Sequence, residues 1–238
     1  MVLVALGVVA AVGACLRFVT SSPLWLDEAL SVNIASLPLD EVSGALRRDG
    51  HPPLFYLLLH GWIAAVGDSD LAVRALSGLW AVALLPLVWI AGRRVGGRRT
   101  AACTVVILAL SPFAVRYATE ARMYAMVSVL ALVGWLAADS AWRRPGLVPL
   151  AGVAVCSALL LWTHYWSIWF LAVGASLLAV LAWRANASGE RPARAAALRI
   201  LAALAVGGLT FAPWLPTLWY QGTHTGTPWT RPSRPAAR

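Results

Sequence analysis

Long apolar stretches alternate with short polar ones along this 238-residue chain. An α-helix needs roughly 20 predominantly apolar residues to cross the hydrocarbon core of a bilayer, and stretches approaching this length recur throughout the sequence. The pattern therefore predicts an all-α, polytopic transmembrane helical bundle that forms a single domain. Seven spans are expected, at about residues 2–19, 71–91, 100–115, 123–138, 147–163, 168–183 and 200–212.

A polar stretch at residues 20–70 separates the first two predicted spans. We expect it to be a loop outside the bilayer, with short helices that begin near Asp27 and Asp40. Its apolar residues 54–66 follow two prolines and are too few to span comfortably, which predicts an interfacial or re-entrant helix. Long loops in compact proteins are usually functional, so this loop is the first place to look for chemistry.

Composition and charge support a membrane protein and indicate its orientation. The chain is 60% hydrophobic and 12% charged, which excludes an ordinary soluble domain. Its net charge of +9 does not indicate nucleic-acid binding, because the arginines lie in short clusters between apolar runs. The positive-inside rule instead places these clusters in the cytoplasm. The clustered arginines are Arg93, Arg94, Arg98, Arg99, Arg143, Arg144, Arg184, Arg191, Arg194 and Arg199.

This orientation predicts a multi-pass protein of the cell membrane with a cytoplasmic N-terminus. Eight of the ten acidic residues then fall on the outer side. Arg17 lies near the outer end of the first span, where its side chain can snorkel to the interface. The outer acidic residues are Asp27, Glu28, Asp40, Glu41, Asp49, Asp68, Asp70 and Glu120.

Two further features concern the cysteines and the end of the chain. Cys15, Cys103 and Cys156 lie inside apolar runs without a metal or redox spacing, so we expect buried small hydrophobes. The ending Pro228-Trp-Thr-Arg-Pro-Ser-Arg-Pro235 stops without a closing element, which predicts a C-terminally incomplete chain.

Adjacent carboxylates follow the first predicted span in Trp25-Leu-Asp-Glu-Ala29. A carboxylate at the membrane surface can act as a general base on an acceptor, or can hold a divalent cation against a phosphate. The alternative interpretation is a helix cap, with Asp27 starting a surface helix and Glu28 near its positive end.

Three other segments bring polar side chains to the outer ends of spans. His51 precedes Pro52-Pro53 and either faces a ligand or merely begins a rigid turn. His164 lies among aromatic residues. An interfacial aromatic belt explains those neighbours by itself, but it explains a histidine at this position less well. The third segment, 111–124, contains Arg116, Tyr117, Glu120, Arg122 and Tyr124.

If segment 111–124 is helical beyond Pro112, then Arg116, Glu120 and Tyr124 share a face. Charged residues at this depth are costly unless they are paired or face a polar cavity. Arginine is the natural partner of phosphate, because its planar guanidinium binds two oxygens together. The alternative is an ion pair between Arg116 and Glu120 that caps a helical hairpin.

Five motifs occur here in one order and together resemble the N-terminal part of family 39-like bacterial membrane glycosyltransferases. Those enzymes have the GT-C fold and are similar to protein O-mannosyltransferases and aminoarabinose transferases. The resemblance covers nearly the whole chain. The motifs are Leu-Trp-Leu-Asp-Glu at 24–28, His-Pro-Pro-Leu-Phe-Tyr-Leu-Leu-Leu-His at 51–60, residues 67–74, Ser-Pro-Phe with Tyr-Ala-Thr-Glu-Ala-Arg-Met-Tyr at 111–124, and Trp-Thr-His-Tyr at 162–165.

The resemblance implies sugar transfer from a polyprenyl-phosphate donor on the extracytoplasmic face, with inversion at the anomeric carbon. It implies that Asp27 activates the acceptor or organises the donor phosphate, with Glu28 beside it, and that Arg122 and Arg116 meet phosphate. The expected substrate-binding residues are completed by His51, Tyr117, Glu120, Tyr124 and His164. A divalent cation is compatible with these residues, and membrane lipid is the expected surrounding.

The chain has no Walker or Rossmann glycine motif, and a lipid-linked donor needs no nucleotide cofactor. Two rival functions belong to other classes. A lipid or solute transporter would carry charges near the membrane midplane and often repeated halves, neither of which the sequence shows. A non-catalytic membrane scaffold would explain the spans but gives the outer carboxylates no purpose.

Overall fold

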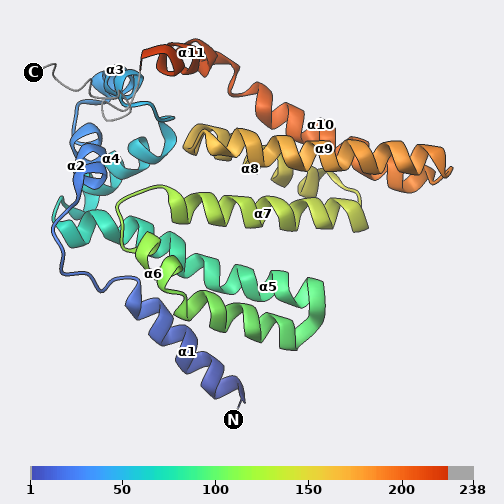
Figure 1. Cartoon of the computed structure of the whole chain (residues 1–238), viewed down its shortest axis with the longest axis horizontal. Coiled ribbons are helices and arrows are strands. Elements are labelled where there is room, and N and C mark those ends of the chain that lie inside the picture. The colour runs from blue at the N-terminus through green and yellow to red at the C-terminus, as the bar shows by residue number, and fades with distance from the viewer. Residues whose placement is uncertain (1, 225–238) are drawn as a thin grey trace, which may run out of the picture.

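A computed structural model of the chain describes residues 2–224, which form helices with no β-strand in that range (Figure 1). The helices are α1 (Val2–Leu16), α2 (Leu26–Ala35), α3 (Leu39–Asp49), α4 (Leu54–Val66), α5 (Asp70–Leu110), α6 (Pro112–Ala118), α7 (Tyr124–Arg143), α8 (Leu147–Thr163), α9 (Trp166–Ala187), α10 (Arg191–Leu209), the 3-10 turn η1 (Ala212–Trp214) and α11 (Leu215–His224). The segment 228–235, on which the expectation of an incomplete chain rests, lies outside the described residues.

Four helices are long and apolar enough to cross a membrane: α5, α7, α9 and α10. Helix α5 contains residues 71–91 and most of 100–115, the two ranges that were predicted as separate spans, and it is bent between them at Gly96 and Gly97. Gly97 has a φ of 79°, which a residue with a side chain rarely adopts, so the bend depends on this glycine. Predicted spans α1 and α8 have 15 and 17 residues, fewer than the roughly 20 that a perpendicular crossing needs.

Several boundaries differ from those that apolar runs alone predict. Helix α10 begins at Arg191 rather than at Ile200, because Pro192 in its first turn favours a helix start and the arginine-rich segment continues the helix. No helix was expected from the sequence at the residues that form α11. Cys15 and Cys103 are exposed, so the prediction that they are buried is wrong, whereas Cys156 is buried as expected.

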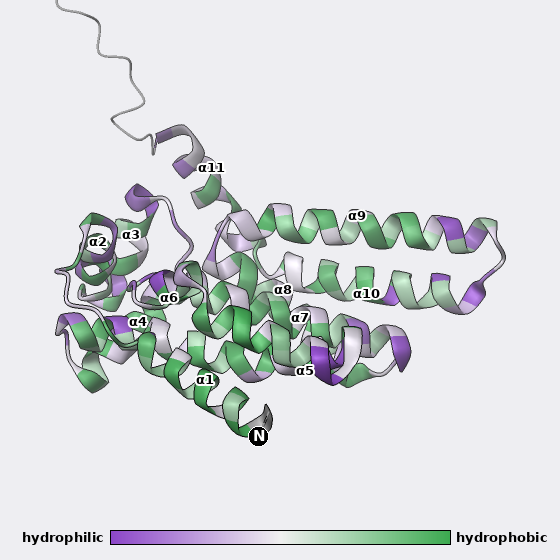
Figure 2. Ribbon diagram, turned by 60° about the horizontal axis from the view of Figure 1, so that its bottom comes forward, coloured by the Kyte–Doolittle hydropathy of each residue, from purple (hydrophilic) through white to green (hydrophobic). Residues whose placement is uncertain are grey.

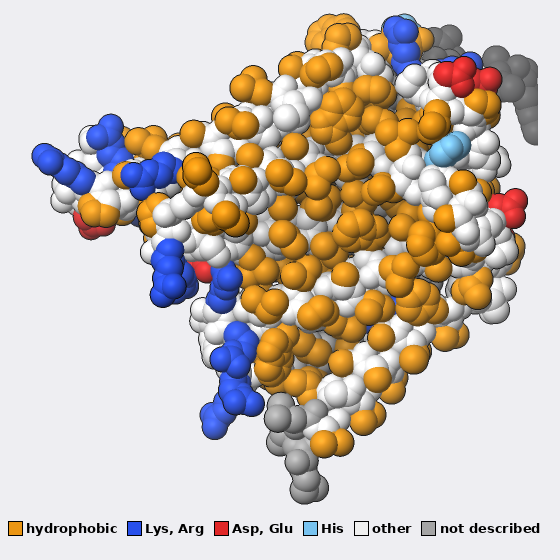
Figure 3. Space-filling model, turned by 180° about the vertical axis from the view of Figure 1, so that it is seen from behind, with side chains coloured by type: hydrophobic (Ala, Val, Ile, Leu, Met, Phe, Trp, Pro, Cys, Tyr) orange, Lys and Arg blue, Asp and Glu red, His pale blue; other side chains and the backbone are white. Residues whose placement is uncertain are grey.

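Charged residues separate to the two ends of the helices. The bend of α5 and the connections α7–α8 and α9–α10 lie together at one end, and α2, α3, α4 and α6 lie at the other (Figure 1). Seen from behind, most of the visible basic side chains gather at the first end, whereas acidic side chains appear at both ends (Figure 3). Between these ends α9 and α10 are largely hydrophobic, with polar residues concentrated near their connection (Figure 2). We call the two ends the arginine end and the carboxylate end.

The arginine end contains an acidic residue that the charge pattern left unexplained. Asp139 accepts from Arg94 at 3.0 Å and from Arg143 at 2.8 Å. Asp139 therefore ties α5 to α7 beside the bend of α5.

The carboxylate end has a core of its own, in which α2, α3 and α4 pack against α5, α7 and α8. Helix α4 occupies residues 54–66, the range predicted for the short apolar helix, and begins directly after Pro53. Gly50 closes α3 in the left-handed conformation, with φ of 95°, and turns the chain toward His51. The buried side chains of this core include Ile34, Val42, Leu46, Phe55, Tyr56, Leu59, Val73, Met123, Met126, Leu130 and Leu160.

Helix α11 lies against α3 at the same end of the molecule. The buried Gln221 side chain donates to the Leu46 backbone oxygen at 2.8 Å, and the Arg47 guanidinium lies 3.9 Å from the centre of the Tyr220 ring. The last described helix therefore covers the loop that follows α1, although almost the whole chain separates them in sequence.

Candidate functional site

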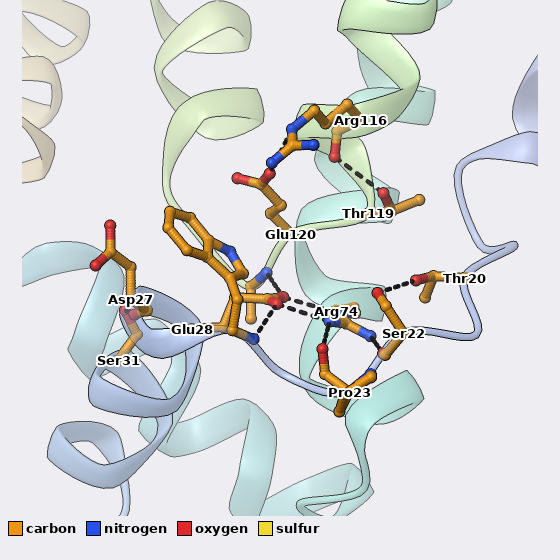
Figure 4. A network of polar contacts seen from close by, with 12 residues as sticks. Thr20, Ser22, Pro23, Asp27, Glu28, Ser31, Arg74, Arg116, Thr119 and Glu120 are labelled. Atoms are coloured by element: carbon orange, nitrogen blue, oxygen red, sulfur yellow. Dashed lines mark hydrogen bonds and ion pairs between the residues drawn. The ribbon is translucent and has the colours of Figure 1, made fainter.

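The two adjacent carboxylates at the start of α2 have different environments. Trp25 is the residue that precedes the helix, and its backbone N–H donates to Glu28 Oε2 at 3.2 Å. Asp27 is the second helical residue, so its interpretation as the helix cap is wrong. The half-buried Asp27 carboxylate makes no hydrogen bond or ion pair with any described residue, and it points away from Glu28 (Figure 4).

Glu28 is fully buried and its hydrogen-bonding capacity is used (Figure 4). Arg74 Nε donates to Glu28 Oε1 at 2.7 Å, and Arg74 Nη2 donates to Oε2 at 2.6 Å. The Ala121 backbone N–H adds a bond at 2.8 Å. Burial alone raises the pKa of Glu28, but the bonds from Arg74 and the backbone outweigh it and hold the pKa below its ordinary value.

This geometry gives Glu28, which was expected to be catalytic, a structural role. A carboxylate that accepts four hydrogen bonds from the protein has no oxygen left for a substrate. Arg74 also donates to the backbone oxygens of Ser22 at 2.7 Å and Pro23 at 3.1 Å. The Glu28–Arg74 pair therefore joins the loop after α1, helix α2, helix α5 and the 119–123 turn.

Arg122 lies in that turn and is as buried as Arg74, with 4% of its surface exposed. Its Nη1 donates to Ser31 Oγ at 2.8 Å and to the Asp27 backbone oxygen at 3.4 Å, and its Nη2 is 3.2 Å from His51 Nε2. The buried Nε has no hydrogen-bond partner. Among the described residues no carboxylate lies within ion-pair distance of Arg122, so its direct hydrogen-bond partners are a hydroxyl, a backbone oxygen and an imidazole.

His51 is held from its other side by Asp49. The His51 Nδ1 and Asp49 Oδ2 atoms are 2.8 Å apart, and the Tyr56 hydroxyl donates to the same oxygen at 3.0 Å. Burial raises the pKa of Asp49, but the bond to His51 prevails and the pKa lies below its ordinary value. Burial, assisted by the charge of Asp49, raises the pKa of Tyr56.

His164 approaches the same cluster from the connection between α8 and α9. Its ring centre lies 6.2 Å from that of His51 and 6.0 Å from that of Tyr124. Burial, followed by the effects of His51 and the Arg122 charge, lowers the pKa of His164 to about 4. His164 is therefore neutral near pH 7.

A groove of about 590 Å³ lies between α5, α6 and α7 and reaches His164. Its walls are mostly apolar, with Tyr117 and Tyr124 in contact at 4.9 Å between ring centres. Arg17 also lines it and is buried, so the expectation that Arg17 snorkels is wrong. It donates to the Leu108 backbone oxygen at 2.9 Å, near the C-terminal end of α5, which favours a cation.

Arg116 and Glu120 form an ion pair of 3.1 Å (Figure 4). Helix α6 ends at Ala118 and α7 begins at Tyr124, so the continuous helix that would place Arg116, Glu120 and Tyr124 on one face is absent. The Arg116 side chain is 70% exposed, whereas Glu120 is buried and burial raises its pKa. The ion-pair interpretation of these two residues is therefore the one that the geometry supports.

The structure gathers five of the residues predicted from sequence: Asp27, His51, Arg122, Tyr124 and His164. Tyr117 lines the adjoining groove. The sequence analysis missed Ser31, Asp49, Tyr56 and Arg74 as parts of the site. A charge one turn inside an apolar helix is the signal that could have identified Arg74, since such a charge needs a partner. The short Asp49–His51 spacing carried a weaker signal.

Within residues 2–224, no group of three or more His, Cys, Asp or Glu side chains is arranged to hold a metal ion. Comparison of the chain with protein-family models, with curated proteins and with solved structures finds no match.

Proposed function

We propose that this chain is a membrane glycosyltransferase of GT-C architecture that moves a sugar from a polyprenyl-phosphate donor to an acceptor. The observation that carries the proposal is the buried Arg122, which has no carboxylate partner, has an unused Nε–H, and contacts the backbone oxygen of Asp27, whose own carboxylate is unpaired among the described residues. A buried cation of this kind is costly unless an anion joins it. The donor phosphate is that anion.

The groove supplies the second part of the argument. A lipid-linked donor has a long hydrocarbon chain and one charged group, and it needs an apolar surface that ends at a cation. The groove is mostly apolar and reaches Tyr124, whose ring centre lies 6.0 Å from the Arg122 guanidinium. The hydrocarbon chain would occupy the groove, with its phosphate at Arg122.

Asp27 would then serve as the general base. The acceptor hydroxyl oxygen forms a bond to the anomeric carbon as the bond between that carbon and the phosphate oxygen breaks. The hydroxyl proton passes to Asp27, and the leaving polyprenyl phosphate keeps the electron pair and is stabilised by Arg122. The acceptor approaches from the side opposite the phosphate, so the anomeric configuration inverts.

Sugar transfer by an Asp27→Asn variant tests this proposal. Membranes containing the full chain are incubated with radiolabelled synthetic polyprenyl-phosphate hexoses and pentoses, and loss of label from the lipid is measured. Removing a general base lowers the rate by about 10²–10⁴-fold, and we expect a loss in this range. Retention of most activity by Asp27→Asn would refute the role of Asp27.

Asp40→Asn is the matched control for this experiment. Asp40 is the second residue of α3, as Asp27 is of α2, and both stand in a Leu-Asp-Glu sequence. Asp40 is exposed and far from Arg122 in the contacts described above. We expect Asp40→Asn to retain wild-type transfer, so a loss confined to Asp27→Asn is not a general effect of removing a surface carboxylate.

The proposal includes the orientation of the protein in the cell membrane, with the carboxylate end outside and the N-terminus in the cytoplasm. The gathering of most visible basic side chains at the arginine end supports it (Figure 3). A topology reporter fused after Arg99 should read cytoplasmic, and one fused after Asp70 should read outside. Identical readings at both positions would rule out this orientation.

A further inference from the structure

His51 lies directly between a cation and an anion. Its Nε2 is 3.2 Å from Arg122 Nη2, and its Nδ1 is 2.8 Å from Asp49 Oδ2. A guanidinium only donates hydrogen bonds, so Nε2 must present its lone pair to Arg122. A carboxylate only accepts them, so Nδ1 must carry the proton. Both contacts therefore require one form of the ring, the neutral imidazole with its proton on Nδ1.

We propose that Asp49 and His51 are positioning residues, which hold the Arg122 guanidinium in place for the phosphate of the donor. This inference rests on the proposed function and assigns a role to Asp49, which the transfer chemistry does not use. Asp49 selects the ring form, and the ring in that form holds Arg122 Nη2. Ser31 Oγ holds Nη1 at 2.8 Å, so the two terminal nitrogens are fixed while Nε stays unused.

The negative charge of Asp49 also reaches Arg122 through the ring. Asp49 Oδ2 accepts from both His51 and the Tyr56 hydroxyl, and the Arg122 charge contributes to the lowered pKa of Asp49. A direct carboxylate partner would occupy the guanidinium and compete with the phosphate. A carboxylate behind a neutral imidazole stabilises the cation and leaves its N–H groups available.

The arrangement makes anion binding sensitive to protonation of His51. The titratable and charged groups that face this ring are Asp49, Tyr56, Arg122 and His164. When the ring takes up a second proton, at Nε2, Arg122 loses its acceptor and a positively charged ring faces the guanidinium. The Arg122 side chain then loses one of its two fixed ends, and we expect phosphate binding to weaken as His51 takes up this proton.

The first test measures the ring form and needs no enzymatic activity. The full chain is labelled with ¹⁵N-histidine, and the His51 signals are assigned by their loss in His51→Gln. We expect the neutral form with the proton on Nδ1 at pH 7.5, and a shift away from it in Asp49→Asn. A proton on Nε2 at this pH, or a spectrum unchanged by Asp49→Asn, would overturn the proposal.

The second test measures binding of unglycosylated polyprenyl phosphate to the protein in nanodiscs. We expect Asp49→Asn to weaken binding about tenfold, as loss of an orienting carboxylate does for histidine ligands. His51→Gln offers Arg122 an oxygen acceptor that does not titrate, so we expect binding near that of wild type at pH 8 and less weakening at acid pH than in wild type, the remainder coming from protonation of the phosphate itself. Equal acid sensitivity of wild type and His51→Gln would contradict the positioning role.

His60→Gln is the matched control, because His60 contacts the Ala35 backbone oxygen at 2.8 Å and is remote from Arg122 in the described contacts. It should bind polyprenyl phosphate as wild type does, with the same acid sensitivity. The two tests also separate this inference from the proposed function. The expected ring form and phosphate binding, combined with absence of sugar transfer from every donor, would refute only the transferase proposal.

Discussion

Arg74 and Arg122 are two arginines at the carboxylate end with the same exposed fraction, 4%, and with opposite surroundings. Arg74 makes two bonds to the buried carboxylate of Glu28 and two to backbone oxygens. Arg122 has a hydroxyl, a backbone oxygen and an imidazole nitrogen as its partners, and its Nε has none. Burial therefore does not distinguish a structural arginine from a binding one. The charge of the partners does.

The difference has an energetic basis. Transfer of a charge from water into a protein interior is compensated when an opposite charge and hydrogen bonds accompany it, as they do at Arg74. Arg122 has no carboxylate within ion-pair distance among the described residues, so its burial is less directly compensated than that of Arg74. Such burial is characteristic of sites where an external ligand completes the arrangement.

The largest effect is expected from breaking the Glu28–Arg74 ion pair. Arg74→Met leaves the Glu28 carboxylate buried and unpaired, and loss of one partner from a buried pair costs about 3–5 kcal/mol. Thermal unfolding of the purified protein in detergent should show this as a lower midpoint than that of wild type. Arg48→Met, at an exposed position of α3, is the control and should leave the midpoint unchanged. A midpoint for Arg74→Met that matches the control would remove the distinction between the two arginines.

A substitution at Arg122 is expected to affect binding rather than stability. Arg122→Met removes a buried charge that has no carboxylate partner, so we expect the free energy of unfolding to stay unchanged or to rise by about 1 kcal/mol. Binding of polyprenyl phosphate should nevertheless be lost. Destabilisation as large as that of Arg74→Met would show that Arg122 is a structural residue.

Arg122→Lys refines this second prediction. An ammonium keeps the charge but cannot bind two phosphate oxygens with the fixed geometry of a guanidinium, so the donor KM should rise about tenfold, or about 1.4 kcal/mol. Donor titrations at saturating acceptor measure this change. An unchanged donor KM together with an altered acceptor KM would place Arg122 on the acceptor side of the site.

The smallest effect concerns pH and the neutral His164 beside Arg122. Its pKa is about 4 in the folded protein against 6.5 for the ordinary group, so the unfolded chain binds more protons between these values. Stability is therefore fully present above about pH 6.5 and falls as the pH decreases toward 4. His164→Gln should reduce this decrease when unfolding midpoints are compared across the range. An unaltered pH dependence would show that His164 is not held neutral by its neighbours.

The helices were predictable from sequence wherever a long apolar run decides the structure. Residues 54–66 and 147–163 were expected as apolar helices, and α4 and α8 have these bounds. Prediction was poorer where polar residues continue a helix or interrupt one. The arginine-rich start of α10 is helical, whereas residues 119–123, which read as part of a helix, form a turn that presents Arg122 to Ser31 and His51.

The two Leu-Asp-Glu sequences show what local sequence cannot determine. Both occupy the first three positions of a short helix, at 26–28 in α2 and at 39–41 in α3. Glu28 is fully buried against Arg74, whereas Glu41 is exposed. The sequence by itself determined that these carboxylates begin helices on the side away from the arginine clusters, because hydrophobicity and charge act along the chain. Only the tertiary structure decided which carboxylate is paired and which is open, because the deciding partner, Arg74, comes from a distant segment of the chain.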